Sequence, residues 1–221
     1  MLFKDRRFAG QILAKELGVY ANRPDVLVLG LPRGGVPVAF EVAKALNAPL
    51  DVLVVRKLGV PEQEELAMGA IASGGVRIVN KYIISLVKIS DEVIAKVAVQ
   101  EERELERRER LYRKNRPLKD LQGRTVILVD DGLATGATMW AAVVAVRKQQ
   151  PAQIVIAVPV AAPETCHELE AEVDKIVSVS APSPFQSVGL WYENFPQTTD
   201  EEVSYLLAKA AKNDEPISIG M

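Results

Sequence analysis

Residues 126–138 constrain the fold more than any other stretch of the sequence. Four apolar residues, 126–129, are followed by the adjacent acids Asp130 and Asp131, by a loop of small residues, and by the apolar segment 139–146. An unbroken apolar run of this length is typical of a strand buried on both faces, and the segment after the loop is typical of a helix. The order strand, acid pair, loop and helix predicts an α/β protein with polar groups at the carboxyl end of a strand.

The chemistry of this stretch suits a phosphorylated sugar. A loop of small residues that enters a helix presents unpaired backbone N–H groups and the positive end of the helix dipole, so it can wrap a phosphate dianion. Thr135 and Thr138 add hydroxyl donors. The carboxylates of Asp130 and Asp131 can accept hydrogen bonds from sugar hydroxyls or hold Mg²⁺ through its water ligands.

The thirteen residues resemble the signature of the type I phosphoribosyltransferases, which bind 5-phosphoribosyl 1-pyrophosphate (PRPP), and every position matches. The resemblance implies that Asp130 and Asp131 act in catalysis, contact the ribose and hold Mg²⁺, the expected cofactor. The residues that it assigns to the 5-phosphate are Ala134, Thr135, Gly136, Ala137 and Thr138.

Three other interpretations of this stretch are less favoured. An ordinary strand-to-helix turn with a polar end is the plainest alternative. A Walker B element would need an upstream G-x-x-x-x-G-K-[ST] motif, which the chain lacks. In a phospho-accepting receiver domain the acids would lie near the start of the domain, and the Thr-Gly-Ala-Thr loop would not be needed.

A second strand, loop and helix unit precedes the first. The apolar run 26–30 is followed by Leu31-Pro32-Arg33-Gly34-Gly35 and by the helix-compatible segment 36–46. Glycines let main-chain N–H groups approach an anion closely, and an arginine adds a charge-assisted contact. The resemblance implies that Arg33, Gly34 and Gly35 bind pyrophosphate, with Arg33 acting in catalysis. A structural turn is the alternative.

The segment 50–79 is expected to form a strand, a mobile loop and a hairpin. The strand covers 50–55, the Gly-, Pro- and charge-rich loop covers 57–65, and Ser73-Gly74-Gly75 joins the two arms of a β-hairpin. The resemblance implies that the loop is the family's flexible catalytic loop, which closes over PRPP and excludes water. Lys57 is then a catalytic and pyrophosphate-binding candidate, with an exposed loop lysine as the alternative.

Two charged helices flank the expected core. Residues 3–19 should form an amphipathic helix with Asp5 as N-cap, and we expect Arg6 and Arg7 to belong to a solvated first turn rather than to face a ligand. Residues 90–115 should form a long Glu/Arg-rich helix, either a solvated helix or a dimer arm or wall of the active site. In the second case an arginine of this helix would reach a phosphate; the candidates are Arg107, Arg108 and Arg113.

The C-terminal third supplies the remaining core and an aromatic cover. Strands are expected at 154–160 and 176–179, with helices at 163–171 and 200–212. Residues 181–200 concentrate aromatics in a chain that is only 5% aromatic. The resemblance implies that this segment binds a small planar acceptor, and a hydrophobic cover over the core edge is the alternative. The acceptor candidates are Phe185, Val188, Trp191 and Tyr192.

Composition limits partners and location. The 221 residues carry 27 Lys+Arg and 29 Asp+Glu, a net charge of −2, so neither nucleic acid nor an anionic membrane is an expected partner. One cysteine, Cys166, fits a reducing compartment, and the absence of a long apolar run or a signal-peptide pattern leads us to expect a cytoplasmic protein. Cys166 and the only histidine, His167, lack the partners of a zinc site or a catalytic triad, so we expect surface or packing roles.

The expected fold is a twisted parallel sheet with helices on both faces, a flexible hairpin flap and a long charged helix. We expect one domain over 1–221, with a core at about 24–180, an acceptor-binding hood at 181–200 and a helical insertion at 90–115. A homodimer is also expected.

The resemblance implies a pentosyltransferase that moves the 5-phosphoribosyl group of PRPP to a nitrogen acceptor and releases pyrophosphate. Hypoxanthine-guanine enzymes of the family carry an Asp where this chain has Ala134, so a 6-oxopurine acceptor is disfavoured. The first alternative is a regulatory protein that binds PRPP without turnover. The second is a sugar-phosphate hydrolase or phosphorylase, for which no dedicated water-activating residue is evident.

Overall fold

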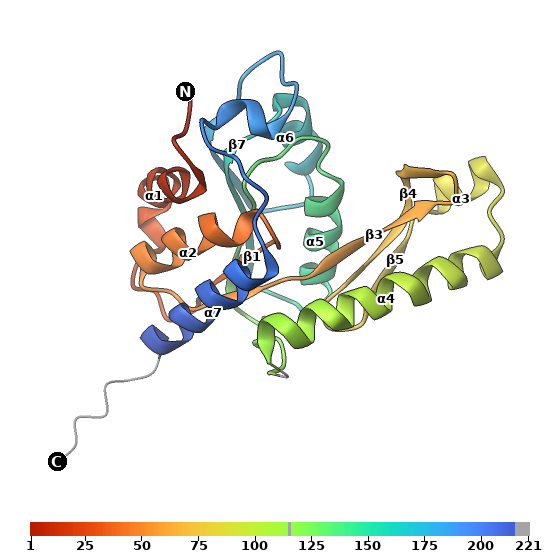
Figure 1. Cartoon of the computed structure of the whole chain (residues 1–221), viewed down its shortest axis with the longest axis horizontal. Helices are drawn as coiled ribbons and strands as arrows, with labels where there is room; N and C mark the ends of the chain where they lie inside the picture. Colours follow the sequence, from red (N-terminus) through yellow and green to blue (C-terminus); the bar gives the residue numbers. More distant parts are fainter. Residues whose placement is uncertain (115, 215–221) are drawn as a thin grey trace.

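A five-stranded parallel sheet forms the centre of the computed structural model, which describes residues 1–114 and 116–214 (Figure 1). Its strand order is β2-β1-β6-β7-β8, and each pair of neighbours is parallel. The strands are β1 (Val26–Gly30), β2 (Leu50–Val52), β6 (Thr125–Val129), β7 (Gln153–Val160) and β8 (Lys175–Ser180). The parallel sheet predicted from the apolar runs is therefore confirmed.

Helices cover both faces of this sheet, as predicted. On one face, alternate strand residues such as Val28 and Ile127 pack with helices α1 (Arg6–Glu16), α2 (Gly35–Leu46) and α7 (Asp200–Asp214). On the other face, residues such as Leu29 and Leu128 pack with α5 (Ala137–Arg147) and α6 (Pro163–Leu169). Since side chains alternate along a strand, an apolar run serves both cores at once.

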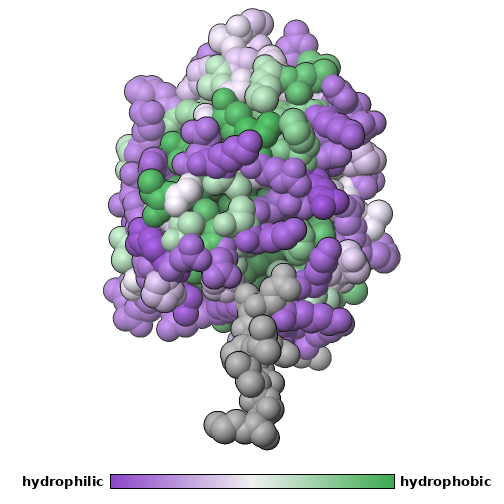
Figure 2. Space-filling view, turned by 90° about the vertical axis from the view of Figure 1, so that its left-hand side faces the viewer, coloured by the Kyte–Doolittle hydropathy of each residue, from purple (hydrophilic) through white to green (hydrophobic). Residues whose placement is uncertain are grey.

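The solvent side of α1, α2 and α7 is predominantly hydrophilic. Figure 2 shows this side of the molecule with apolar groups in small areas between charged and polar side chains. Asp5 caps α1 by accepting the N–H of Phe8, as predicted. On α6, the side chain of His167 is 88% exposed and Cys166 packs at the edge of the core, in agreement with the expected surface and packing roles.

A separate antiparallel sheet extends away from the central one (Figure 1). It consists of β3 (Val55–Val60), β4 (Gln63–Ala72) and β5 (Val76–Val79). Helix α3 (Lys81–Val87) follows it, and the long helix α4 (Asp91–Arg113) returns along β3 with Ser90 as its N-cap. The predicted hairpin and long helix are confirmed up to position 113, whereas position 115 lies outside the described residues.

Two predictions about this region are wrong. The single strand expected over 50–55 is divided, because β2 ends at Val52 in the parallel sheet and β3 begins at Val55 in the antiparallel one. The loop expected over 57–65 is mostly strand, since 57–60 belong to β3 and 63–65 to β4, joined at Pro61 and Glu62. Pairing with β4 and burial of Leu58 and Val60 outweigh the loop-like composition.

The segment after β8 returns over the carboxyl ends of the central strands. It contains a short 3₁₀ helix, η2 (Val188–Trp191), and pairs with the N-terminus through a bridge between Phe3 and Tyr192. A second 3₁₀ helix, η1 (Gly18–Tyr20), follows α1. No helix among the described residues is both long and apolar enough to cross a membrane.

Candidate active site

The acid pair lies at the carboxyl end of β6, beside the loop that follows β1. Asp130 accepts the backbone N–H of Asp131 at 2.8 Å, which fixes the two carboxyl groups next to each other. Because β1 and β6 are neighbours, Gly34 comes so close that a Cβ atom there would lie 2.0 Å from Oδ2 of Asp131. The sequence-predicted acids and the Leu31–Gly35 loop therefore meet at one edge of the sheet.

Burial raises the pKa of both acids above the ordinary range. For Asp130 the rise is large, and the negative charge of Asp131 adds to it. For Asp131 the effect of burial is opposed by a hydrogen bond and ion pair from Arg6. Two neighbouring carboxyl groups that have lost hydration are stabilised by binding a proton or a cation. Acid pairs with raised pKa values of this kind are typical of functional sites.

Arg6 is a site residue that sequence reasoning misplaced. Its Nε donates to Oδ2 of Asp131 at 2.7 Å and its Nη1 donates to the carbonyl of Pro196 at 2.6 Å. Its guanidinium lies 3.7 Å from the centre of the Phe195 ring, and the side chain is only 11% exposed. The expected solvated turn is therefore wrong for Arg6, although it holds for Arg7, which is 71% exposed.

The loop expected to hold the 5-phosphate lies on the other side of the acid pair. Gly136 has a φ of 73° and precedes the first turn of α5. This left-handed conformation favours glycine over residues with a side chain. Thr165 of α6 donates its hydroxyl to the carbonyl of Ala134, which anchors the loop. The side chains of Thr135 and Thr138 are exposed, so their hydroxyls and the N–H groups at the start of α5 are open to a ligand.

A cavity of about 240 Å³ opens between this loop and the antiparallel sheet. Its lining includes Lys57 of β3, Trp140 of α5 and the loop residues Thr135, Gly136 and Thr138. Lys57 thus lies next to the loop expected to hold the 5-phosphate, and it belongs to a strand paired with β4 rather than to a mobile loop. The cavity is apolar on most sides, with the loop as its polar end.

The C-terminal segment contacts the backbone of the acid pair. Val188 packs against Gly132, and Tyr192 donates its hydroxyl to the backbone carbonyl of Asp131 at 2.6 Å. Phe185 stacks on Trp191 with ring centres 6.5 Å apart. The indole N–H of Trp191 is buried and has no hydrogen-bond partner among the described residues.

One of the four acceptor candidates does not face an open site. The ring of Tyr192 is 6% exposed and packs against Phe3 and Phe195, and burial raises the pKa of its hydroxyl. The ring of Tyr192 is thus enclosed by these two side chains, and its contact with an acceptor stays a prediction. Tyr192 holds the backbone of the acid pair, while Phe185, Val188 and Trp191 are partly exposed.

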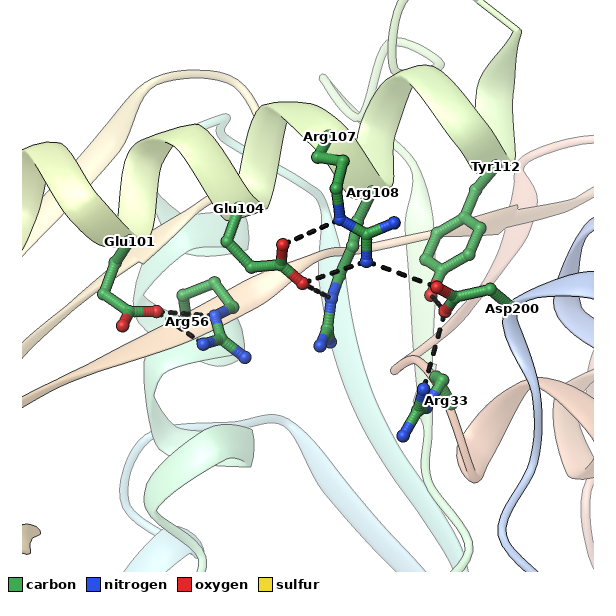
Figure 3. Close-up of polar contacts among 8 residues, drawn as sticks. All are labelled: Arg33, Arg56, Glu101, Glu104, Arg107, Arg108, Tyr112 and Asp200. Atoms are coloured by element: carbon green, nitrogen blue, oxygen red, sulfur yellow. Dashed lines mark hydrogen bonds and ion pairs between the residues drawn. The ribbon is translucent and has the colours of Figure 1, made fainter.

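The pyrophosphate candidate Arg33 joins a row of ion pairs beneath α4 (Figure 3). Its Nη1 lies 3.8 Å from Oδ1 of Asp200, the first residue of α7. Asp200 also pairs with Arg107 at 3.2 Å and accepts the hydroxyl of Tyr112 at 2.5 Å. None of these contacts was evident from the sequence, because Arg107 and Asp200 are 93 residues apart.

The three arginines of the long helix that are candidates for a phosphate contact differ in their surroundings. Arg107 and Arg108 both bond Glu104, at 2.8 and 2.7 Å. Arg113 is 5% exposed and pairs with Asp51 at 3.1 Å and with Glu109 at 2.8 Å. The structure speaks against Arg113 as the candidate, because its charge is already neutralised inside the protein by Asp51 and Glu109.

Comparison with known proteins gives a consistent set of similarities. The model of the phosphoribosyl transferase domain family matches residues 2–193. A Mycobacterium tuberculosis protein, provisionally named a phosphoribosyl transferase, is 45% identical over 212 residues, covering 96% of this chain and 48% of the relative. The chain thus spans about half the length of the curated relatives it matches.

Two solved structures extend this comparison. A crystal structure of a Thermus thermophilus protein is 42% identical with a TM-score of 0.83, and the match covers 95% of this chain and 99% of that one. The structure of an Aquifex aeolicus protein is 14% identical with a TM-score of 0.51, covering 91% of this chain and 86% of that one. The second similarity concerns the fold alone.

Proposed function

Because the chain belongs to the phosphoribosyl transferase domain family, we propose that it transfers the 5-phosphoribosyl group of PRPP to a nitrogen acceptor and releases pyrophosphate. One observation carries this proposal. The acid pair at the end of β6 lies between two loops that each present backbone N–H groups and small residues, one after β1 and one before α5. A ligand with phosphates at both ends and hydroxyls in the middle matches that order.

Each group has a defined part in the proposed reaction. The 5-phosphate occupies the loop from Ala134 to Thr138, and the ribose hydroxyls donate to the carboxylates of Asp130 and Asp131. The loop at Arg33 and Gly34 receives the pyrophosphate, with Lys57 as a further cation. The bond between C1 and the pyrophosphate oxygen breaks, its electron pair leaves with pyrophosphate, an acceptor nitrogen bonds C1, and the nitrogen's proton passes to solvent. Preorganised cations and N–H groups stabilise the departing charge.

The two carboxylates of Asp130 and Asp131 fit a Mg²⁺ ion that also binds the substrate's phosphates better than a metal coordinated by protein side chains alone. Among the described residues no group of three or more His, Cys, Asp or Glu side chains is arranged to hold a metal, and Asp131 is already paired with Arg6. Mg²⁺ often binds one or two carboxylates while keeping waters and substrate phosphate oxygens. Asp130 and Asp131 would hold it here, and it would supply charge neutralisation to the pyrophosphate.

We propose a planar acceptor other than a 6-oxopurine. Ala134 offers no carboxylate to a purine imidazole nitrogen. The partly exposed Phe185, Val188 and Trp191 supply an apolar surface beside the acid pair. A flat heterocycle suits such a surface.

The test is pyrophosphate release from PRPP and Mg²⁺ against a panel of nucleobases and small amines. The control is the double variant Asp130→Asn/Asp131→Asn, which keeps the size of both side chains and removes their charge. We expect release with one acceptor and its loss in the control. PRPP binding that is unchanged in the double variant would refute the assignment of the acid pair.

A regulatory protein that binds PRPP without turnover is the second candidate, since the same loops would serve a sensor. It predicts PRPP binding that depends on Asp130 and Asp131, with no pyrophosphate release across the panel. A homodimer also stays a prediction, which light scattering at several protein concentrations checks.

A further inference from the structure

The carboxylate of Asp200 stands where three donors from other parts of the fold converge (Figure 3). Arg33 comes from the loop after β1, whereas Arg107 and Tyr112 come from α4, and Asp200 itself begins α7. Oδ1 faces Arg33 and Tyr112, and Oδ2 faces Arg107. One carboxylate therefore bridges two guanidinium groups that belong to distant segments.

A carboxylate bridging two arginines marks a position where phosphate oxygens also fit. Guanidinium groups bind carboxylate and phosphate with the same planar, charge-assisted geometry. Arg33 lies in the loop proposed to receive pyrophosphate, and Gly34 of that loop touches Asp131 of the acid pair. The bridged position is thus continuous with the proposed pyrophosphate site.

We propose that Arg107 is a further binding residue for the pyrophosphate group of PRPP, and that Asp200 holds Arg107 and Arg33 together until phosphate oxygens replace its carboxylate. This inference rests on the proposed function and adds a residue from the long helix to it. It also gives the Glu/Arg-rich helix a part in ligand binding beyond its packing on β3.

The side chain of Arg107 is far more exposed than that of Arg113, an arginine of the same helix that only stabilises the fold. Arg113, on the same helix, is 5% exposed and enclosed by Asp51 and Glu109. Arg107 is 50% exposed, Arg33 is 30% exposed and Asp200 is 18% exposed, so solvent and solutes reach their polar groups. An exchange of the carboxylate for a phosphate then needs side-chain rotation and no opening of the core.

Glu104 holds the guanidinium of Arg107 in place independently of Asp200. Its carboxylate accepts from Arg107 at 2.8 Å and from Arg108 at 2.7 Å, so Arg107 stays oriented even when it loses Asp200. The remaining partner of Asp200 is the hydroxyl of Tyr112, which can keep the displaced carboxylate hydrogen-bonded. The network can therefore release two cations without leaving a charged group unpartnered.

The test is isothermal titration of the full chain with inorganic pyrophosphate and, separately, with PRPP, both in the presence of Mg²⁺. Arg107→Gln should weaken both ligands by about 10-fold or more, because a charge-assisted hydrogen bond is lost. Arg107→Lys should recover part of that loss. Asp200→Asn keeps the acceptor for Tyr112 but removes the competing charge, so it should tighten both ligands by about 5-fold.

Two matched controls remove a charge without touching the bridge. Arg110→Gln alters an exposed arginine of α4, and Glu201→Gln alters an exposed acid of the first turn of α7. Both should leave the affinities within about 2-fold of the wild type. A dissociation constant in Asp200→Asn that is unchanged or weaker, or an Arg107→Gln variant that binds like Arg110→Gln, would overturn the proposal.

The outcomes also separate this inference from the function on which it rests. If the wild-type chain binds neither pyrophosphate nor PRPP, the proposed function fails and the inference fails with it. If the wild type binds PRPP in a manner that needs Asp130 and Asp131 while the Arg107 and Asp200 variants behave like the controls, the function stands and only the inference is refuted.

Discussion

Replacement of Arg6 by methionine should destabilise the protein, because it removes the cation that pairs with Asp131 at 2.7 Å. Methionine keeps much of the arginine volume and the apolar contact with Phe195, but it removes the bonds to Asp131 and to the Pro196 carbonyl. Burial already raises the pKa of Asp130 and Asp131. The loss of the guanidinium therefore leaves two poorly hydrated carboxyl groups next to each other.

The magnitude follows from the geometry of the pair. At 2.7 Å and an effective dielectric constant of about 20, the Coulomb attraction is about 6 kcal/mol, much of which the loss of hydration offsets. Removing one member of a buried pair typically costs about 3–5 kcal/mol. Arg6 and Asp131 are 11% and 15% exposed, so the lower end applies. We expect the free energy of unfolding at neutral pH to fall by about 3 kcal/mol.

The pH dependence gives a second readout with a definite sign. The folded-state pKa of Asp131 is already raised, and without Arg6 it rises further above its unfolded value, so the folded variant binds protons more tightly than the unfolded chain. Its stability therefore recovers as the pH falls towards about 4, the ordinary range of an aspartate. The difference in unfolding free energy between wild type and Arg6→Met should be greatest at neutral pH and should narrow in acid.

Urea unfolding followed by circular dichroism measures these quantities for the wild type, Arg6→Met, Asp131→Asn and the double variant. The coupling energy between the two sites should be about 2 kcal/mol, because Asp131→Asn removes the charge that Arg6 compensates. Arg6→Lys serves as the charge-preserving control and should lose less stability than Arg6→Met. Additive losses in the double variant, or a stability difference that does not change with pH, would refute the reasoning.

Three further predictions concern other contacts. A Cβ atom at Gly34 would lie 2.0 Å from Asp131, whereas one at Gly18 meets nothing within 4 Å. Gly34→Ala should therefore lower the free energy of unfolding by about 2 kcal/mol and weaken PRPP binding, with Gly18→Ala as the calorimetric control. Arg113→Met should lose about 3 kcal/mol because Asp51 and Glu109 would lose their buried cation, and equal stability in Arg113→Met and Arg110→Met would contradict this. Hydrogen bonds from Arg107 and Arg108 lower the pKa of Glu104 to about 2, so its stabilising effect is present above the ordinary glutamate pKa and is lost as the pH falls from there through the folded-state value. Glu104 is 30% exposed and is therefore screened by solvent. In urea unfolding, Glu104→Gln should cost less than about 1 kcal/mol at neutral pH and nothing at the acid end, and a cost that grows in acid would disprove the effect.

The central sheet was predictable because its signals are local. Strands β1, β6 and β7 are short apolar runs, and each is followed by a loop and a helix-compatible segment. The antiparallel sheet was harder, because the stretch 57–65 has the composition of a loop. The pairing of β3 with β4 and the packing of α4 make strands of 57–60 and 63–65, and a single sequence does not display those contacts. Helix α3 was missed although Asn80 caps it by accepting the N–H of Ile83.

In the candidate site, too, some features have local sequence signals and others depend on contacts between distant segments. The two glycine-containing loops and the acid pair lie within short continuous stretches, so spacing alone predicts that they converge at one sheet edge. Arg6 reaches Asp131 across 125 positions, and Arg107 reaches Asp200 across 93. Arg6 and Arg107 are the same residue type as Arg7 and Arg110 nearby, so the sequence does not mark either of them as a site residue. What selects one member of each set is the direction in which its helix face points once the helix is packed, and that direction depends on the complete fold.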